Sequence, residues 1–402
     1  MKRFALEKLK EWKKKANRKP LIIRGARQVG KTWLMKEFGR TCFEKVAYVN
    51  FDSNTRMQQV FDGEINIERI ILAISAETGI SIDVKDTLLI FDEVQEVPKA
   101  LSSLKYFCEN APEYAIVAAG SLLGVALHKG TSFPVGKVDF MDLYPLTFQE
   151  FLCALGEERF VNILQGTDTD MVTTFKSKYI DRLREYYYVG GMPEVVQTYV
   201  ETKDFNQVRE IQKNLLNYYQ QDFSKHAETS LVPRLNLVWN SIPMQLAKEN
   251  KKYIYGQVRK GSRAKDFELA IQWLLDCGLI HKVQRAGKAA LPLKAYLDLD
   301  VFKIYLLDVG LLMAMTDMDA QVIIDGNRIF TEFKGALTEQ YVLQQLIALD
   351  HIEPYYYSTA NSSGEIDFLL QGRTSIIPLE VKAEENLRAK SLKAFCEKYK
   401  PK

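Results

Sequence analysis

The stretch of this sequence best suited to chemistry reads L-I-I-R-G-A-R-Q-V-G-K-T, over residues 21–32. Gly25 and Gly30 let the backbone wrap closely around an anion, with positive φ where needed, so that successive N–H groups face phosphates. Lys31 supplies a mobile charge for β- and γ-phosphates, and Thr32 offers a hydroxyl to Mg²⁺. We predict a phosphate-binding loop made by Gly25, Ala26, Arg27, Gln28, Val29, Gly30, Lys31, Thr32 and Trp33.

The elements on either side of this loop support the prediction. The apolar residues Leu21–Ile23 precede it and indicate a strand, and Trp33–Phe38 continues it at helical spacing. Strand, loop and helix in this order are the context that a phosphate-binding loop requires. The alternative is an accidental glycine turn, which would need neither flanking element.

Two candidate acids end the apolar run Thr87–Phe91. The run is nearly continuous, as expected for a buried parallel strand, and it delivers Asp92 and Glu93 to the edge of a sheet. Asp92 is placed to hold Mg²⁺ through water, and Glu93 is placed to polarise a water that attacks the γ-phosphate in line. The alternative is a strand end followed by a solvated acidic turn.

Two further apolar runs predict strands of the same sheet. Lys45–Phe51 brings Asn50 and Asp52 to the edge where ligands of open α/β sheets bind. Tyr114–Ser121 ends in Ser121, whose hydroxyl is placed to bind the γ-phosphate or its water and so to report the nucleotide state. Ser121 is alternatively the N-cap of a helix that begins at Leu122.

Length and composition fit a protein of several domains with a sizeable core. The chain has 402 residues, 47% of them hydrophobic, and a formal net charge of +3. Nine Lys/Arg and two Glu fall within residues 1–19, so the basic character is local. No uncharged apolar run reaches the length of about 18 residues that a spanning helix needs, which favours a soluble cytoplasmic protein without a membrane partner. Five scattered cysteines indicate neither a disulfide framework nor a zinc site.

Several motifs together resemble one family. They are G-A-R-Q-V-G-K-T, the strand L-L-I-F-D-E-V-Q, G-S-L-L-G from Gly120, the run from Phe133 to Phe151, and two motifs at residues 190–194 and 303–312. This set, which covers nearly the whole chain, is similar to prokaryotic AAA-type ATPases with a C-terminal domain of unknown function, often described as nuclease-like. The resemblance implies ATP binding and hydrolysis at Lys31, Thr32, Asp92 and Glu93, with Ser121 as the sensing position.

The sequence departs from the family where an arginine finger is expected. Many relatives are expected to carry arginine after Gly136, where this sequence has Lys137. Lysine cannot make the bidentate contact of an arginine finger, and that contact is worth about 10³- to 10⁵-fold in other phosphoryl-transfer enzymes. We therefore expect slow hydrolysis or a finger elsewhere. Arg182 and Arg184 are candidates, and ordinary surface arginines are the simpler interpretation of both.

Residues 156–230 predict a helical lid. The segment is polar and has helical periodicity, with leucine and tyrosine residues at core-like spacing. Gly190–Gly191 breaks the chain, and Pro193 stiffens the segment after it. We expect the opening of this lid to depend on nucleotide.

Residues 231–325 predict a winged helix-turn-helix. Two apolar helical stripes, over Leu235–Leu246 and Phe267–Leu275, are followed by a turn into a strand at Cys277–Val283. A basic stripe accompanies them, formed by Lys248, Lys251, Lys252, Arg259, Lys260, Arg263 and Lys265, with Tyr253 and Tyr255 interleaved. Such a stripe suits DNA phosphates while the tyrosines stack or pack. The alternative is a module that contacts protein.

Residues 326–402, the tail, carry a second candidate site. We predict Glu339 in a helix, Asp367 in one strand, and Glu380 and Lys382 in the next strand, where a spacing of two puts both side chains on one face. The spacings of 28 and 13 residues between the acids, followed by E-x-K, resemble the core of restriction-endonuclease-like folds. In that resemblance Asp367 and Glu380 bind Mg²⁺, Lys382 positions or deprotonates water, and Glu339 supports the metal. The site is either nuclease-like and metal-binding or a folded, inactive remnant.

The end of the sequence bears on that site. The chain stops at Lys402, just after a predicted helix over Leu387–Lys398, whereas relatives usually continue with another strand. We expect either an incomplete nuclease-like core or a truncated sequence.

The sequence thus predicts an α/β protein with four parts. These are a P-loop ATPase domain over residues 1–155, the lid over 156–230, a winged helix over 231–325 and a restriction-endonuclease-like α/β domain over 326–402. We expect a Mg·ATP-hydrolysing ATPase that acts on or near DNA. The competing function is an ATP-dependent regulatory switch that binds a protein partner and has an inactive tail. A small-molecule kinase is a third possibility, for which the sequence shows no second substrate pocket. The resemblance implies assembly into a homo-oligomer, but no sequence feature fixes its size or the biological target.

Overall fold

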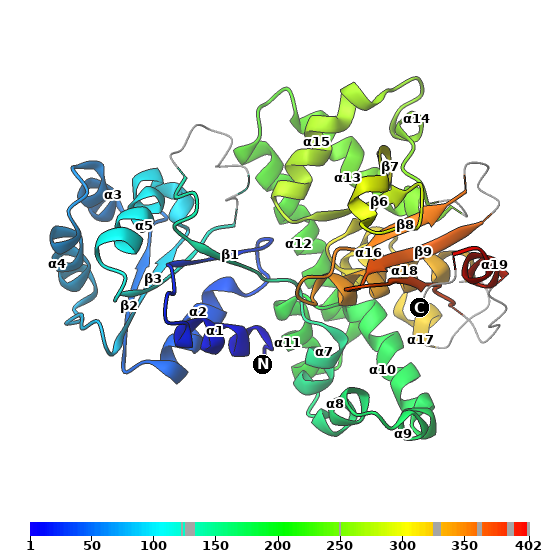
Figure 1. Cartoon of the computed structure of the whole chain (residues 1–402), viewed down its shortest axis with the longest axis horizontal. Helices are drawn as coiled ribbons and strands as arrows, with labels where there is room; N and C mark the ends of the chain where they lie inside the picture. Colours follow the sequence, from blue (N-terminus) through cyan, green and yellow to red (C-terminus); the bar gives the residue numbers. More distant parts are fainter. Residues whose placement is uncertain are drawn as a thin grey trace. The chain divides into compact units, whose positions relative to one another are not determined.

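The computed structural model describes residues 1–121, 124, 133–248, 251–324, 331–359, 364–383 and 390–399. It divides into two compact units, residues 2–144 and residues 145–402 (Figure 1). The finer boundaries expected after residues 155, 230 and 325 stay predictions. Within the described residues, no helix is both long and apolar enough to cross a membrane.

The first unit is built on a parallel sheet, whose five described strands follow the order β2-β3-β4-β1-β5. The strands are β1 (Leu21–Arg24), β2 (Lys45–Asn50), β3 (Thr87–Asp92), β4 (Ala115–Ala119) and β5 (Asp139–Asp142). The helices are α1 (Ala5–Lys14), α2 (Lys31–Cys42), α3 (Thr55–Asp62), α4 (Ile67–Thr78) and α5 (Pro98–Asn110), with a 3₁₀ turn η1 (Val94–Glu96). The strands predicted from the apolar runs, and the parallel sheet, are confirmed.

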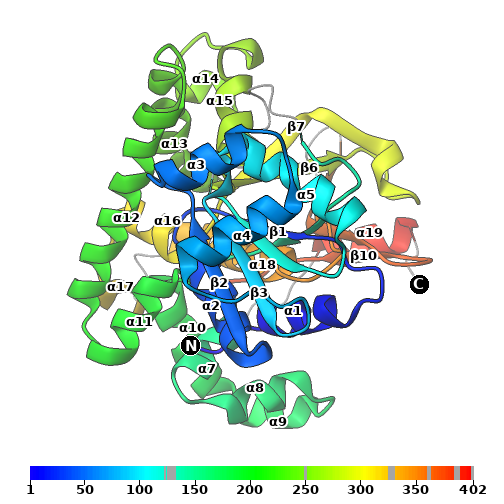
Figure 2. The same ribbon diagram turned by 90° about the vertical axis from the view of Figure 1, so that its left-hand side faces the viewer.

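Helices cover both faces of this sheet (Figure 2). One face packs against α3, α4 and α5 through a buried cluster that includes Phe61, Phe91 and Leu101. Helix α2 packs on the other face, and α1 packs on α2, where the ring centroids of Trp12 and Phe38 lie 6.2 Å apart. Burial on both faces explains why the strands are almost continuously apolar in sequence.

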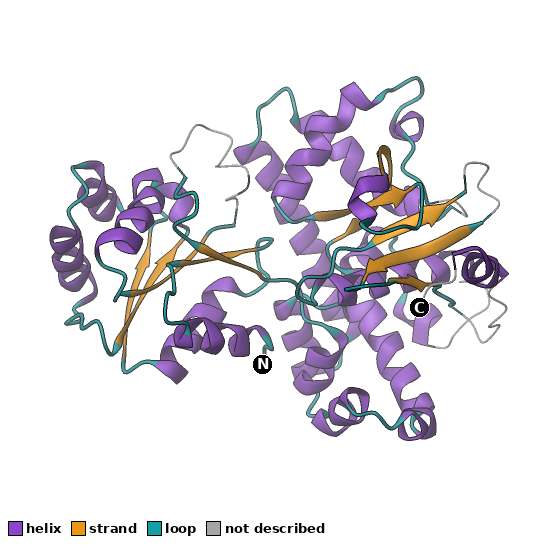
Figure 3. Cartoon of the chain, viewed as in Figure 1, coloured by secondary structure: helices purple, strands orange, loops and turns teal. Residues whose placement is uncertain are grey.

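The second unit begins with helices, drawn purple in Figure 3. They are α7 (Phe148–Ala154), α8 (Glu158–Gln165), α9 (Thr169–Thr174), α10 (Lys176–Val189), α11 (Pro193–Thr202) and α12 (Phe205–His226). These elements confirm the helical character predicted for residues 156–230. The role of this segment as a lid stays a prediction.

The glycine pair Gly190–Gly191 ends α10 at a crowded junction. A Cβ on Gly191 would lie 2.1 Å from the carbonyl oxygen of Leu146, and Gly191 N donates to Asp308 Oδ2 at 2.6 Å. Asp308 is fully buried and also caps the following helix, α16 (Val309–Met315). The two downstream motifs that carry the family resemblance therefore fold against one another.

A helix-turn-helix and a mixed sheet complete the second unit. The helices are α13 (Val232–Leu246), α14 (Tyr255–Val258), α15 (Ala264–Asp276), α17 (Ala320–Ile324), α18 (Thr331–Ile347) and α19 (Lys390–Tyr399). The strands are β6 (Ile280–Ala286), β7 (Leu297–Leu306), β8 (Tyr355–Ser358), β9 (Glu365–Gln371) and β10 (Ile376–Leu379), with a 3₁₀ turn η2 (Leu293–Tyr296) before β7. Two apolar-faced helices followed by the β6–β7 hairpin confirm the order predicted for a winged helix.

The β6–β7 hairpin belongs to the same sheet as the strands of the tail. The sheet order is β10-β9-β8-β6-β7, with β8 parallel to β6 and the other neighbours antiparallel. The predicted wing and the predicted C-terminal domain thus share one sheet. This pairing holds the tail against the hairpin.

The strand predicted to contain Glu380 and Lys382 is shorter than expected. Strand β10 ends at Leu379, and the amide two residues further on, Val381 N, donates to the side chain of Asp367 at 2.7 Å. The chain leaves the sheet because this amide binds a carboxylate in place of a backbone carbonyl. Glu380 and Lys382 therefore follow β10 and do not lie in it, which corrects the predicted strand, although their side chains still meet on one side of the chain.

Candidate functional site

The predicted phosphate-binding loop connects β1 to α2. Gly30 has φ 94° and is the N-cap of α2, which begins at Lys31. Gly25 has φ 146°, and a Cβ there would lie 2.2 Å from the carbonyl oxygen of Leu143. Both positions favour glycine because of these dihedral angles, and Gly25 also because backbone approaches it closely.

Lys31 is buried inside its own loop. Its ammonium donates to the carbonyl oxygens of Gly25 at 2.9 Å and of Ala26 at 2.8 Å. Burial lowers the pKa of Lys31 to about 8, against the opposing effect of the Glu93 and Asp92 carboxylates. The amine therefore lies at the start of α2, where the helix dipole and the first-turn N–H groups also favour an anion.

Thr32 and Asp92 meet across the strand ends. Thr32 Oγ1 donates to Asp92 Oδ2 at 2.7 Å, and the Tyr48 hydroxyl donates to the same oxygen at 3.0 Å. Burial, followed by the charge of Asp92, raises the pKa of Tyr48, so the phenol keeps its proton. A hydroxyl and a carboxylate are oxygen ligands of the kind Mg²⁺ prefers, so this pair fits that ion. Tyr48 is not evident from the sequence because a tyrosine within an apolar strand has no distinctive spacing.

Glu93 lies immediately beyond β3 with φ 52°. Its Oε1 accepts a hydrogen bond from Ser121 Oγ at 3.0 Å, and its Oε2 accepts one from Gln95 Nε2 at 2.7 Å. Left-handed conformations of residues other than glycine are uncommon, and such strain often marks functional sites. Ser121 therefore contacts the predicted catalytic acid, while the helix expected from Leu122 begins outside the described residues.

The site residues predicted in the first unit come together at the carboxyl edge of the sheet. Lys31 and Thr32 follow β1, Asp92 and Glu93 end and follow β3, and Ser121 follows β4, which lies between β1 and β3. Of the other loop residues, Ala26 and Val29 are buried, Arg27 and Gln28 lie in the loop, and Trp33 is 44% exposed. The edge thus combines a cation, two hydroxyls and two carboxylates, the groups that the sequence predicted for this site.

Both finger candidates have carboxylate partners. The Arg182 guanidinium lies 2.7 Å from Glu157 and 2.6 Å from Glu185, and that of Arg184 lies 3.8 Å from Asp181. Lys137, at the position where an arginine was expected, lies 2.9 Å from Glu109. Glu157 and Glu185 bind the guanidinium N–H groups of Arg182 that an arginine finger would direct at a phosphate. The pairing supports the surface interpretation of Arg182, and the location of any finger stays a prediction.

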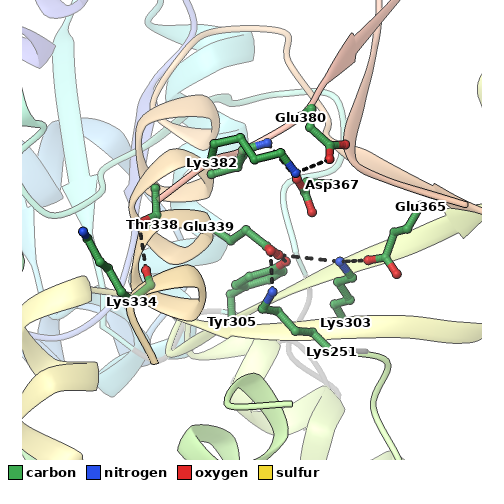
Figure 4. Close-up of polar contacts among 11 residues, drawn as sticks. Lys251, Lys303, Tyr305, Lys334, Thr338, Glu339, Glu365, Asp367, Glu380 and Lys382 are labelled. Atoms are coloured by element: carbon green, nitrogen blue, oxygen red, sulfur yellow. Dashed lines mark hydrogen bonds and ion pairs between the residues drawn. The ribbon is translucent and has the colours of Figure 1, made fainter. Parts of the chain in front are cut away.

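The tail residues converge on a buried charge cluster, shown in Figure 4. Glu339 of α18 pairs with Lys251, lies 3.6 Å from Lys303 Nζ and accepts from the Tyr305 hydroxyl at 3.1 Å. Lys303 of β7 is fully buried and lies 2.5 Å from Glu365 as well. Burial opposes the charge of Glu339, but Lys303 and Lys251 lower the pKa of its carboxyl. Lys303 was not predicted because it lies within an apolar strand.

The other three tail residues, Asp367, Glu380 and Lys382, add charges beside this cluster. Burial, and then the charge of Glu339, raises the pKa of Asp367 to about 7. Lys382 Nζ pairs with Glu380 at 2.5 Å. Among the described residues, no group of three His, Cys, Asp or Glu is placed to hold a metal ion. Lysines occupy Glu339, the residue predicted to support the metal, and Mg²⁺ binding by Asp367 and Glu380 stays a prediction.

The basic stripe divides between the interior and the surface. Lys251 faces inward to Glu339, and Tyr253 is buried and stacks on Phe302 with ring centroids 5.5 Å apart. Four basic residues remain exposed around the turn before α15, and we call them the basic turn: Arg259, Lys260, Arg263 and Lys265. These four are the most exposed part of the stripe.

Comparison with known families agrees with the geometry of the first unit. Residues 17–152 match a family described as an AAA domain. This part of the chain is a P-loop ATPase domain of AAA type. Residues 180–322 and 334–402, beyond the AAA domain, match two families described as domains of unknown function, DUF8612 and DUF4143. No curated protein sequence matches the chain.

Solved structures similar to the chain have low sequence identity and low scores. A Walker-type ATPase of Pyrococcus abyssi gives a TM-score of 0.48 at 14% identity, over 77% of this chain and 94% of that chain. The Aeropyrum pernix ORC1 protein in complex with DNA gives 0.30 at 12% identity, over 78% and 91%. Cdc6p from Pyrobaculum aerophilum gives 0.25 at 11% identity, over 77% and 88%. The assignment of the AAA domain depends on the family match and the site geometry.

Proposed function

We propose that this protein hydrolyses ATP in its AAA domain and contacts DNA through the basic turn. The observation that carries the ATPase proposal is the convergence of Thr32, Asp92, Glu93 and Ser121, linked by hydrogen bonds of 2.7 Å and 3.0 Å. Three strand ends that are distant in sequence supply these groups. That arrangement has no evident use in a nucleotide-independent structural domain.

Lys31 and the first turn of α2 bind the phosphates in this proposal. Lys31 exchanges its hydrogen bonds with Gly25 and Ala26 for phosphate oxygens, which suit a cation better than neutral carbonyls do. Thr32 and Asp92 would hold Mg²⁺, which would supply positive charge beside the phosphates. Tyr48 keeps the Asp92 carboxylate aimed at Thr32.

Glu93 acts on the attacking water. Its carboxylate accepts a proton as water attacks the γ-phosphorus, which is the general-base role that phosphoryl transfer to water calls for. Ser121, which contacts Glu93, senses whether a γ-phosphate is present. Nucleotide state is thereby coupled to the end of β4.

One reaction with Mg²⁺, ATP and plasmid DNA tests both halves of the proposed function. We expect ATP turnover in the parent, loss of turnover in Lys31→Ala and unchanged turnover in Lys382→Ala, because Lys382 lies in the other unit. Plasmid cleavage that disappears in both variants would identify an ATP-controlled nuclease. Turnover without cleavage in the parent would identify a switch with a silent tail, and no turnover in the parent would contradict the ATPase proposal.

DNA contact by the basic turn is tested by salt dependence. Phosphate contacts release counterions, so the affinity for duplex DNA should fall as salt rises, and removing one phosphate contact should lower the slope of log K against log salt by about one. We expect Arg259→Glu/Lys260→Glu to lower this slope. Lys294→Glu is the matched control, since Lys294 is exposed but pairs with Glu353 away from the turn. An affinity that stays flat with salt would contradict DNA binding.

A second candidate function is a regulatory switch that binds a protein partner and never cleaves nucleic acid. The observation that favours it is the pairing of Glu339 with Lys251 and Lys303, which leaves the acid of α18 without an open side for a metal ion. In this case ATP controls the partner contact, and the tail is structural. Parental plasmid cleavage that disappears in Lys382→Ala would contradict this second candidate.

A further inference from the structure

Gln95 has a fixed orientation beside Glu93. Its Nε2 donates to Glu93 Oε2 at 2.7 Å and lies 3.4 Å from Glu96 Oε1. A carboxylate can only accept hydrogen bonds, so the amide must present its NH₂ group to Glu93 and its carbonyl oxygen elsewhere. The direction of the Gln95 carbonyl is therefore set by Glu93.

The carbonyl oxygen of Gln95 lacks a protein partner. Gln95 Oε1 is buried and accepts no hydrogen bond from any residue that the structure describes. A buried acceptor without a donor costs about 1–3 kcal/mol, so such atoms in native proteins usually serve a further role. An acceptor adjacent to the catalytic acid suits a water molecule as its donor.

The attacking water needs two acceptors. To point a lone pair at the γ-phosphorus, it must direct both of its hydrogens away from the phosphate, and each hydrogen needs an acceptor. The Glu93 carboxylate is one acceptor. We propose that Gln95 Oε1 is the second, so that Gln95 holds the attacking water for ATP hydrolysis. This inference rests on the ATPase activity proposed above and adds a residue to that site.

The local fold supports this assignment. Glu93 and Gln95 are separated by Val94, which is fully buried and anchors η1 to the core. The left-handed backbone of Glu93 turns the chain so that both side chains meet. The strained conformation is therefore explained by the need to place two water acceptors from one short turn.

A water held by Glu93 and Gln95 would react with the γ-phosphate of ATP as follows. The water oxygen forms a bond to the γ-phosphorus, and the bond from that phosphorus to the β–γ bridging oxygen breaks, with its electron pair leaving on ADP. One water proton passes to Glu93. The other, directed at Gln95 Oε1, stays on the phosphate product.

The first experiment separates turnover from binding in the full-length protein. Gln95→Leu keeps the size of the side chain but removes both its donor and its acceptor. We expect kcat to fall about 100-fold, as for a misplaced reactant, with KM and ATP affinity near parental values. Gln59→Leu is the matched control, since it makes the same exchange at an exposed glutamine of α3, and it should leave kcat unchanged.

Two further measurements distinguish water positioning from a merely structural role. In a double-mutant cycle with Glu93→Gln, the two losses should not add, because both residues hold one water. The Gln95→Leu protein should also lose trapping of ADP with aluminium fluoride, which mimics the transition state with an axial water. It should keep trapping with beryllium fluoride, which mimics the ground state.

The outcomes separate this inference from the proposed function. A parent that hydrolyses ATP together with a Gln95→Leu protein of parental kcat would overturn the role of Gln95 alone. Equal losses of ATP affinity, kcat and melting temperature in Gln95→Leu would also overturn it, since they indicate a structural role. A parent without turnover would overturn the ATPase proposal and this inference together.

Discussion

Lys31 is the residue whose protonation should be visible in nucleotide binding. Its pKa of about 8 lies below the ordinary lysine value of 10.5 because the amine is buried. Bound phosphates favour the ammonium, so above pH 8 binding must take up a proton. We predict that affinity for metal-free ATP weakens about 25-fold between pH 7.5 and 9.5.

The lowered pKa of Lys31 also makes folding stability depend on pH. Between pH 8 and 10.5 the folded chain holds fewer protons on Lys31 than the unfolded chain does. Burial of the charged amine therefore lowers the free energy of unfolding fully below pH 8, and this loss of stability disappears as pH rises.

Fluorescent ATP titrations in EDTA would measure the predicted change in ATP affinity. Lys31→Met should bind more weakly at every pH with a flat profile, and a parent with a flat profile would contradict the prediction.

The site residues at strand ends could be predicted from the sequence, because each of them directly follows an apolar run. Asp92, Glu93 and Ser121 follow apolar runs, and parallel pairing brings such ends together. Tyr48 and Gln95 were not predicted, because their roles depend on which carboxylate lies opposite them in the fold. Sequence spacing carries no information on such side-chain partners.

At the scale of elements, Gly310 is expected to limit the packing of α16. A Cβ there would lie 2.4 Å from the carbonyl oxygen of Val189 and 2.6 Å from Gly190 N, and neither backbone atom can move easily. We predict that Gly310→Ala lowers the free energy of unfolding by about 1–3 kcal/mol, as overpacking does. Urea denaturation would measure it.

Gly335 provides the control for this prediction. It also lies inside a helix, α18, but no described atom lies within 4 Å of where its Cβ would be. Because alanine favours a helix, Gly335→Ala should raise stability by up to about 1 kcal/mol. Equal effects of the two substitutions would contradict the role of the junction between α10 and α16.

Element order was predicted better than strand pairing and strand ends. The two helices of the helix-turn-helix have apolar residues at helical spacing, and this pattern can be recognised from the sequence alone. The parallel pairing of β6 with β8 joins distant segments and has no local signature. The end of β10 was missed because a side chain, Asp367, takes the Val381 amide that would extend the ladder.

At the scale of the whole molecule, the buried charge cluster joins the helix-turn-helix region to the tail. Lys303 lies between Glu339 and Glu365 and has no exposed surface (Figure 4). Removing one partner of a buried pair leaves an uncompensated charge, so we predict that Lys303→Met costs about 3–5 kcal/mol. Chemical denaturation would measure this cost.

A second substitution tests the origin of that loss. Lys303→Met/Glu339→Gln should recover part of the stability, because it also removes the Glu339 charge, which Lys303→Met leaves without that partner. Lys382→Met should cost less than about 1 kcal/mol, since Lys382 is partly exposed. Equal costs for Lys303→Met and Lys382→Met would contradict the structural importance of the cluster.

The measurement that tests the central claim most directly is Mg²⁺-dependent ATP turnover by the parent and by Glu93→Gln, with ATP binding measured on both proteins. The substitution keeps the size of the side chain but removes the base that Ser121 and Gln95 hold. We predict near-parental binding and a fall in kcat of at least about 100-fold. Turnover by Glu93→Gln at the parental rate, or a parent that binds but never hydrolyses ATP, would contradict the account.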